Sequence, residues 1–173
     1  MLIGVISDTH GYVHPRLHDV FKGVDYILHA GDAGDDSVLD ELQLIAPVTA
    51  VSGNMDGTPT ARRTLTRTVT LGGVKIGMHH GHYPGAGGGS LGVRLVSLFN
   101  RERPDIIIHG HTHYAEVYSL GNVMIVNPGA ACRSGVCVGA PTVALIEIRS
   151  PRDYSIEIVE LAQGLQRDAP SQP

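Results

Sequence analysis

Five short apolar segments of this chain each run directly into aspartate, asparagine or histidine. In "DIIIHGHTH", three isoleucines lead into His109, His111 and His113. The other four segments end in "SDTH" with Asp8 and His10, "AGD" with Asp32, "SGNMD" with Asn54 and Asp56, and "HHGH" with His79, His80 and His82. Apolar runs of this length between polar loops are typical of buried strands. The chain is therefore constrained to form a sheet whose strands carry polar side chains at their carboxyl ends.

The first part of the chain alternates between strand and helix patterns. Apolar runs predict buried strands at residues 1–7, 25–29 and 47–51, and the spacing of apolar residues predicts helices at 14–21 and 35–44. This alternation is typical of βαβ units around a partly parallel sheet.

The second part of the chain is more antiparallel in style. The segment "RTVTLGGVKIGM" predicts a hairpin that turns at Gly72 and Gly73. A helix is expected at about 90–101, after a glycine-dense loop at 84–89 that lacks the ending of a phosphate-binding loop. The strand of "DIIIHGHTH" follows, and further strands are expected at 122–127, 141–148 and 154–160.

The composition restricts the class of protein and its partners. A length of 173 residues with 42% hydrophobic content predicts one α/β domain over residues 1–161 and a flexible tail over 162–173. A net charge of −4 without a basic run gives no support for general nucleic-acid binding. The apolar runs are too short for a membrane span, and no signal peptide is evident at the N-terminus. We therefore expect a cytoplasmic protein that binds no membrane.

The two cysteines, Cys132 and Cys137, lie five residues apart in a glycine-rich loop. They lack the paired spacing of a structural zinc site. Because the rest of the chain does not resemble a secreted protein, we expect both to be free thiols.

The side chains at the strand ends have the chemistry of metal ligands. In open α/β sheets, ligands bind outside the carboxyl ends of the strands. His111 and His113 are two residues apart, so in extended backbone both point to the same side. A mixed set of imidazoles, carboxylates and one amide disfavours Ca²⁺ or Mg²⁺ and suits Mn²⁺, Fe, Zn²⁺, Co²⁺ or Ni²⁺.

The order of these motifs resembles a known family. D-x-H, GD, GN, HGH and GH-x-H follow one another as in the calcineurin-like metallophosphoesterase superfamily, and "NPGA" at 127–130 also fits. The short length and the "GNMD" form look most like its small single-domain prokaryotic phosphodiesterases, the YfcE-like branch. The resemblance covers residues 1 to about 160. It implies a four-layer αββα sandwich in which two mixed β-sheets are flanked by helices.

The resemblance also implies a binuclear metal centre with two divalent ions, of which Mn²⁺ is the first choice. It assigns one metal to Asp8, His10, Asp32 and His113, and the other to Asp32, Asn54, His80 and His111. Asp32 would bridge the two ions, and His82 would lie beside the site and face the phosphate. His29 and His109 are expected to support the strand ends, and His79 to be an exposed or packing histidine.

The expected reaction is hydrolysis of a small phosphodiester by a metal-bridging hydroxide, which makes the protein a phosphoric diester hydrolase. Two divalent ions, two carboxylates and a hydroxide leave a charge of about +1, which favours a diester monoanion. Arg133, close after "NPGA", is a candidate for binding the substrate phosphate; otherwise it is a solvated loop charge.

Other functions are compatible with the same motifs. A phosphomonoesterase or a nuclease could use the same binuclear centre, although the lack of basic runs weighs against a processive nuclease. A short nucleotide or a cyclic nucleotide is a plausible substrate. The small retromer subunit resembles this family but serves as a protein-binding scaffold. Assembly into a homo-oligomer is an expectation from the family alone.

Met55 departs from the family pattern, since many members have histidine after the GN asparagine, where it is thought to assist the leaving group. Leaving-group protonation must then come from His82, Asp56 or water, and Asp56 could instead orient a ligand histidine. We therefore expect a preference for substrates with acidic leaving groups. Met55→His should raise the rate on diesters with poor leaving groups, measured as kcat against leaving-group pKa. A variant with no such gain would count against this hypothesis.

Overall fold

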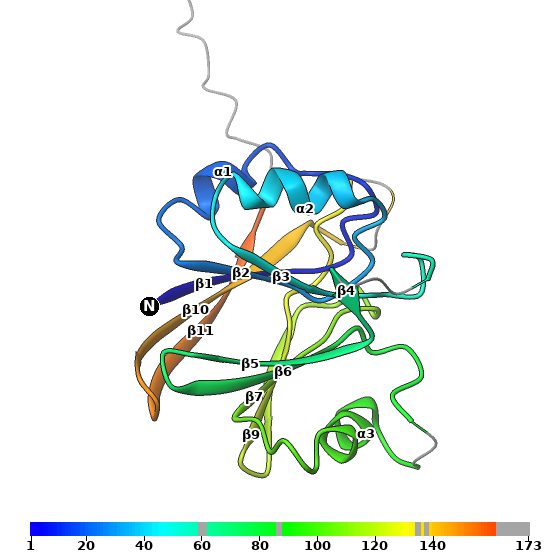
Figure 1. Cartoon of the computed structure of the whole chain (residues 1–173), viewed down its shortest axis with the longest axis vertical. Coiled ribbons are helices and arrows are strands. Elements are labelled where there is room, and N and C mark those ends of the chain that lie inside the picture. The colour runs from blue at the N-terminus through cyan, green and yellow to red at the C-terminus, as the bar shows by residue number, and fades with distance from the viewer. Residues whose placement is uncertain (59–61, 86–87, 134–135, 137–138, 162–173) are drawn as a thin grey trace, which may run out of the picture.

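The computed structural model describes residues 1–58, 62–85, 88–133, 136 and 139–161. Two mixed β-sheets pack face to face, with α1 and α2 on the outer face of one and α3 on the outer face of the other (Figure 1). This confirms the expected four-layer α/β sandwich. The predicted tail at 162–173 lies outside the described residues.

The first sheet contains the first three predicted strands. Its order is β11-β10-β1-β2-β3-β4. β1, β2, β3 and β4 are parallel, whereas β10 is antiparallel to β1 and to β11. The bounds are β1 Leu2–Ile6, β2 Tyr26–His29, β3 Val48–Val51, β4 Arg63–Thr64, β10 Thr142–Ser150 and β11 Asp153–Glu160. The parallel pairing brings the carboxyl ends of β1, β2 and β3 to one edge.

The second sheet begins with the predicted hairpin, in which Leu71 pairs with Val74 across the two glycines. Its order is β5-β6-β7-β9-β8. β6, β7 and β9 are parallel, so the "HHGH" and "GHTH" segments also leave the sheet at one edge. The bounds are β5 Thr66–Leu71, β6 Val74–His79, β7 Ile106–Ile108, β8 Glu116–Leu120 and β9 Val123–Asn127.

The apolar core explains why the strands read as continuous hydrophobic runs. Ile106 and Ile108 face the cluster between the sheets, whereas Ile107 faces Leu95 and Phe99 around α3. Successive strand residues point to opposite faces, and here both faces are covered. A third cluster joins α1 and α2 to the outer face of the first sheet; it includes Leu17, Phe21, Ile27, Val38 and Leu42.

The helices are shorter than predicted. Asp35 is the N-cap of α2 (Asp36–Gln43), and its carboxylate accepts a hydrogen bond from Ser37 N at 2.8 Å. Ser90 is the N-cap of α3 (Leu91–Leu98). Arg16 is the N-cap of α1 (Leu17–Val20), and its side chain makes no capping hydrogen bond. Without a cap, the orphan amides of the first turn gain no partner from a side chain, and the helix covers only part of the predicted span. No described helix is long and apolar enough to span a membrane.

Three features were not predicted. β4 is a two-residue edge strand, and β8 is largely exposed, so neither leaves a clear hydrophobic pattern. The expectation of free thiols is wrong for Cys132, which is buried and disulfide-bonded. The expectation used the general character of the chain, whereas the folded loop decides whether a sulfur is close enough to pair. Cys137 lies outside the described residues.

His29 ends β2 as a fully buried histidine, as expected for a group that supports the strand end. Its Nδ1 accepts a hydrogen bond from Gly31 N at 3.2 Å, and its Nε2 lies 3.0 Å from Thr9 Oγ1. Burial lowers the pKa of His29 to about 4. The folded protein therefore keeps this imidazole neutral at pH values where the unfolded chain protonates it.

This predicts a stability contribution from His29 that is full above pH 6.5 and is lost as the pH falls to about 4. The contribution is on the order of 3 kcal/mol for a shift of this size. Denaturant unfolding of chelator-treated protein across this pH range should give a shallower pH slope for His29→Asn than for the natural chain. His18→Asn, at an exposed histidine of α1, is the matched control for the loss of an imidazole. Equal slopes for the natural chain and His29→Asn would contradict the prediction.

Candidate metal centre

The loops that follow β1, β2, β6 and β7 meet at the edge where the two sheets approach each other. Asp8 Oδ1 lies 3.2 Å from His113 Nε2 and 3.8 Å from His80 Nε2. His80 Nε2 lies 3.3 Å from Asp32 Oδ2, and His10 Nε2 lies 3.5 Å from His113 Nε2. Ligand atoms from four separate loops therefore converge.

The donor atoms form two overlapping groups, in each of which the atoms lie within 4.8 Å of one another. One group is Asp8, His10 and His113, and the other is Asp8, Asp32 and His80. Asp8 is common to both groups, whereas the family resemblance gives the shared position to Asp32. Both carboxylates contact His80, so both lie between the two halves of the centre.

The other predicted residues lie around these groups. The ring centroid of His111 is 5.3 Å from that of His80, and the centroid of His82 is 5.4 Å from that of His80. His79 is buried and stacks on His82 at 5.6 Å, which fits a packing histidine. Asn54 is exposed, and its neighbour Met55 donates a backbone hydrogen bond to Asp32 Oδ1 at 2.8 Å.

The backbone at the ligands is strained. Seven non-glycine residues in the described part of the chain have positive φ, and five of them are predicted ligands: Asp8 (54°), His10 (49°), Asp32 (54°), His111 (70°) and His113 (63°). Left-handed backbone costs about 1–3 kcal/mol at a non-glycine residue and persists only where the surroundings impose it. Such strain concentrates at functional sites. The ligand motifs contain no sequence signal that predicts it.

Backbone hydrogen bonds hold the ligand loops together. Asp8 N donates to Gly31 O at 3.0 Å and His10 N to Asp32 O at 3.0 Å, which joins the loops after β1 and β2. Gly110 N donates to His80 O at 2.9 Å, which joins the loops after β6 and β7. The strained conformations are thus fixed from several directions.

Two glycines allow the loops to approach one another. A Cβ at Gly110 would overlap Ser7 Oγ and the carboxylate of Asp8, and a Cβ at Gly53 would overlap the carboxylate of Asp32. Across the gap, His111 N donates to Asp8 Oδ2 at 3.1 Å. The two sheets therefore meet through the Asp8 carboxylate, with no room for a side chain at position 110.

Asn127 at the end of β9 supports the same region, a role that the sequence analysis did not assign. Its buried Nδ2 donates to Gly110 O at 3.1 Å and to Thr112 Oγ1 at 2.8 Å. In the sequence, Asn127 was marked only as the first residue of the "NPGA" segment. Asn127 therefore fixes the loop that carries His111 and His113.

The charges of the centre reinforce one another. The Asp8 carboxylate, whose Oδ1 lies 3.2 Å from His113 Nε2, raises the pKa of His113. Burial alone would lower the pKa of His80, but the close Asp32 carboxylate and the charge of Asp8 raise it overall. Burial would raise the pKa of Asp32, but the close imidazole of His80 and its charge lower it overall. Burial, followed by the charge of His80, lowers the pKa of both His82 and His111.

The donor atoms fit a bound metal. Asp8 Oδ1 and His80 Nε2 are buried, and neither has a partner with hydrogen-bond geometry among the described residues. Their polar neighbours are the other donor atoms of the two groups, at 3.2–3.8 Å. A buried polar atom without a partner costs free energy, and native structures contain few of them. Both atoms belong to the groups described above, so a divalent cation coordinated there would satisfy them. The mixed imidazole and carboxylate donors suit a transition metal.

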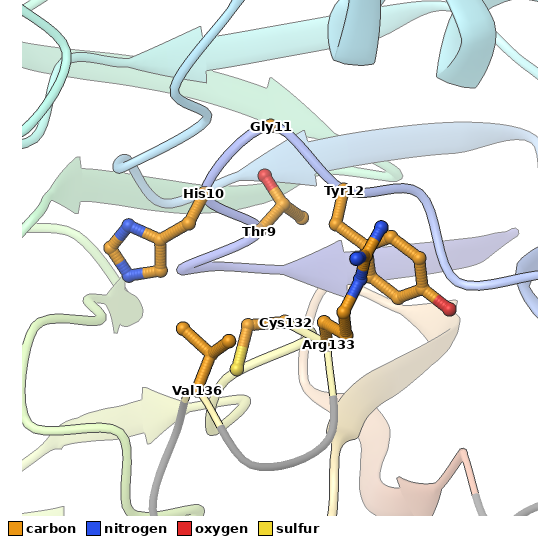
Figure 2. A pocket seen from close by; sticks show the side chains of 7 residues that line it. All are labelled: Thr9, His10, Gly11, Tyr12, Cys132, Arg133 and Val136. Atoms are coloured by element: carbon orange, nitrogen blue, oxygen red, sulfur yellow. The ribbon is translucent and has the colours of Figure 1, made fainter.

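Asp56 and Arg133 each contact residues that lie beside the candidate ligands. The carboxylate of Asp56 is buried; it accepts hydrogen bonds from Gly34 N and Gly53 N, both at 2.7 Å, and pairs with Arg63 at 3.2 Å. Arg133 lies over the ring of Tyr12, 5.4 Å from its centroid, in a pocket that includes His10 (Figure 2). No sequence motif pointed to Tyr12 or Arg63.

Known proteins share both this sequence and this fold. Residues 1–151 match the Calcineurin-like phosphoesterase superfamily domain. A probable metallophosphoesterase of Methanocaldococcus jannaschii is 35% identical over 162 residues, which cover 91% of this chain and 77% of that protein. A phosphodiesterase of the same organism is 26% identical over 178 residues, which cover 92% of this chain and all of that protein.

The crystal structure of Vps29 of Entamoeba histolytica in complex with Zn²⁺ has a TM-score of 0.73 and 26% identity to this chain. The match covers 92% of this chain and 99% of that structure. With a family match over most of its length, and with the family's ligand motifs gathered at one edge of the sandwich, this chain belongs to the calcineurin-like phosphoesterase superfamily.

Proposed function

We propose that the protein is a metal-dependent phosphodiesterase that hydrolyses a small phosphodiester. The observation that carries this proposal is the set of strained ligand residues, because strain at five donors is maintained only where the fold imposes it. The orphaned Asp8 Oδ1 and His80 Nε2 support it. A relative named a phosphodiesterase supports the reaction, and a Vps29 structure with zinc supports metal binding by this fold.

Each residue of the centre has a proposed role. Asp8, His10 and His113 would hold one cation, and Asp32, His80, His111 and the Asn54 amide the other, with a carboxylate shared between them. When bound, two divalent cations supply a nucleophilic water at neutral pH and stabilise charge on the phosphate oxygens. His82, beside His80 and His111, would donate a hydrogen bond to a non-bridging phosphate oxygen.

The charge of the proposed centre suits a diester monoanion. Asp8 and Asp32 are the two carboxylates of the donor groups, and the other donors of these groups are imidazoles. The proposed Asn54 ligand would add an uncharged amide. Two divalent cations with two carboxylates leave about +2 before a hydroxide is counted. A diester monoanion is then bound and its developing charge stabilised. Mn²⁺ is the metal that we propose first.

The test is hydrolysis of bis(p-nitrophenyl) phosphate by protein that has been stripped with a chelator and then given Mn²⁺. Activity should return with the metal, and Asp8→Asn and His111→Ala should each lower kcat by about 10² or more, as losses of transition-state stabilisation do. His18→Ala, at an exposed histidine of α1, is the matched control and should keep the natural rate.

No turnover with Mn²⁺, Ni²⁺, Co²⁺ or Zn²⁺ in folded protein would overturn the proposal. A protein-binding scaffold would then be the better account, since a vacuolar protein sorting-associated protein 29 of Schizosaccharomyces pombe is 29% identical over 156 residues.

We propose a positioning role for Asp56 in place of proton transfer to the leaving group. Its two backbone hydrogen bonds tie Gly53, next to the Asn54 ligand, to Gly34, near Asp32. Arg63 neutralises the buried carboxylate. A carboxylate held by three donors is organised to fix loops, and it supports the ligands through their backbone.

Asp56→Asn should therefore weaken Mn²⁺ binding by about 10- to 100-fold, as is typical when outer partners of a metal site are lost. Metal titration measures this directly, and at saturating Mn²⁺ most of kcat should be recovered. Asp36→Asn is the matched control. Asp36, like Asp56, pairs with Arg63, at 3.0 Å, but of the two carboxylates only that of Asp56 accepts hydrogen bonds from Gly34 N and Gly53 N. Natural metal affinity with a large loss of kcat in Asp56→Asn would instead identify a proton donor.

A further inference from the structure

A pocket of about 230 Å³ adjoins the metal centre on the side of His10. Thr9, His10, Gly11 and Tyr12 from the loop after β1 form one wall, and Cys132, Arg133 and Val136 from the segment between β9 and β10 form the other. Figure 2 shows His10 at one end and Tyr12 with Arg133 at the other. A molecule in this pocket would therefore extend from a candidate metal ligand to an aromatic side chain.

The far end of the pocket has the chemistry of a stacking site. The Arg133 guanidinium lies over the half-buried Tyr12 ring, 5.4 Å from its centroid. Flat aromatic rings stack on tyrosine and on guanidinium planes, and this is the usual way in which proteins hold an unpaired nucleobase. Arg133 also brings a positive charge toward an anionic substrate. A simple alkyl ester of phosphate could use the charge but not the stacking surface.

Both walls are held by the backbone that builds the metal centre. Tyr12 N donates to Thr9 O at 3.0 Å, and Gly11 N donates to Ala33 O, next to Asp32, at 2.7 Å. On the other wall, Ala131 N donates to Ser7 O at 3.0 Å. The backbone next to Tyr12 and the backbone that leads to Arg133 are therefore both tied to the loops that carry Asp8 and Asp32.

Other exposed aromatic side chains near the ligands lack this setting. Tyr83 and Tyr114 follow the "HHGH" and "GHTH" motifs, but they are 90% and 63% exposed, and they do not line this pocket. Tyr12 thus differs from them in its pocket and in its cationic partner. Tyr114 provides a matched control for a tyrosine close to the centre.

We propose that this pocket binds the base of a nucleoside ester, so that the preferred substrates are phosphodiesters that carry a nucleoside on one side. The proposal rests on the phosphodiesterase activity proposed above. The base stacks at Tyr12 and Arg133, and the phosphate lies beyond His10 at the metal centre. Tyr12 and Arg133 then determine specificity, and the ligand residues perform the hydrolysis.

The test compares two diesters with the same leaving group, thymidine 5′-(p-nitrophenyl phosphate) and methyl p-nitrophenyl phosphate, with the Mn²⁺-loaded enzyme. The natural chain should have the higher kcat/KM on the thymidine ester. Tyr12→Ala should remove about tenfold or more of that preference, as loss of a stacking partner does, so kcat/KM should fall much more on the thymidine ester than on the methyl ester. Tyr12→Phe and Tyr114→Ala should keep the preference, and Arg133→Ala should reduce it.

A second measurement does not depend on turnover. Thymidine 5′-monophosphate should bind to chelator-treated natural protein, and Tyr12→Ala should weaken this binding about tenfold, measured by calorimetry. Equal loss on both esters in Tyr12→Ala, no loss on either, or no binding of the nucleotide would overturn the subsite. Failure to hydrolyse even the methyl ester, with nucleotide binding that depends on Tyr12, would overturn the proposed reaction and leave the subsite standing.

Discussion

The left-handed backbone at Asp8, His10, Asp32, His111 and His113 is the constraint on which the rest of the site depends. A residue with a Cβ adopts this conformation at a cost, so the surroundings must supply the difference. They do so through backbone hydrogen bonds between neighbouring loops and through the Asp8 carboxylate, which accepts from His111 N on the other sheet. Strain therefore points the donors inward before any metal arrives. This arrangement reduces the reorganisation that binding would otherwise require.

The sandwich provides the frame that imposes this strain. β1, β2 and β3 are parallel in one sheet and β6, β7 and β9 in the other, so both sheets direct their carboxyl ends to the same region. The apolar cluster between the sheets fixes their separation, and the glycines at 53 and 110 remove the side chains that would prevent close contact. The metal centre, the Asp56–Arg63 pair and the Tyr12 pocket are then three adjoining parts of one candidate site. In the proposed function, the first would hold the metals, the second would fix the loops, and the third would provide a place for the substrate.

Much of this could be predicted from the sequence, because the ligands follow directly after recognisable strands. The order of the motifs was enough to predict the sandwich, and Ile106–Ile108 reads as a buried strand because helix α3 covers one face and the opposing sheet the other. Features that depend on contacts between distant segments were not predicted. They include the roles of Asn127, Arg63 and Tyr12, the disulfide at Cys132, and β8, whose exposed residues follow no hydrophobic pattern. From the sequence, Asp56 was a candidate for proton transfer to the leaving group. Its two backbone hydrogen bonds and its ion pair with Arg63 are visible only in the fold.

The most direct test of the central claim is the location of the metals themselves. Anomalous diffraction at the manganese absorption edge, from crystals of the protein grown with Mn²⁺, would locate each ion without reference to activity. The account predicts two peaks roughly 3.5–4 Å apart, as in two-metal hydrolases. One should lie among Asp8, His10 and His113 and the other among Asp32, His80 and His111, with the backbone of these residues unchanged. A single peak, peaks elsewhere, or ligand loops that move to ordinary backbone conformations on binding would contradict it.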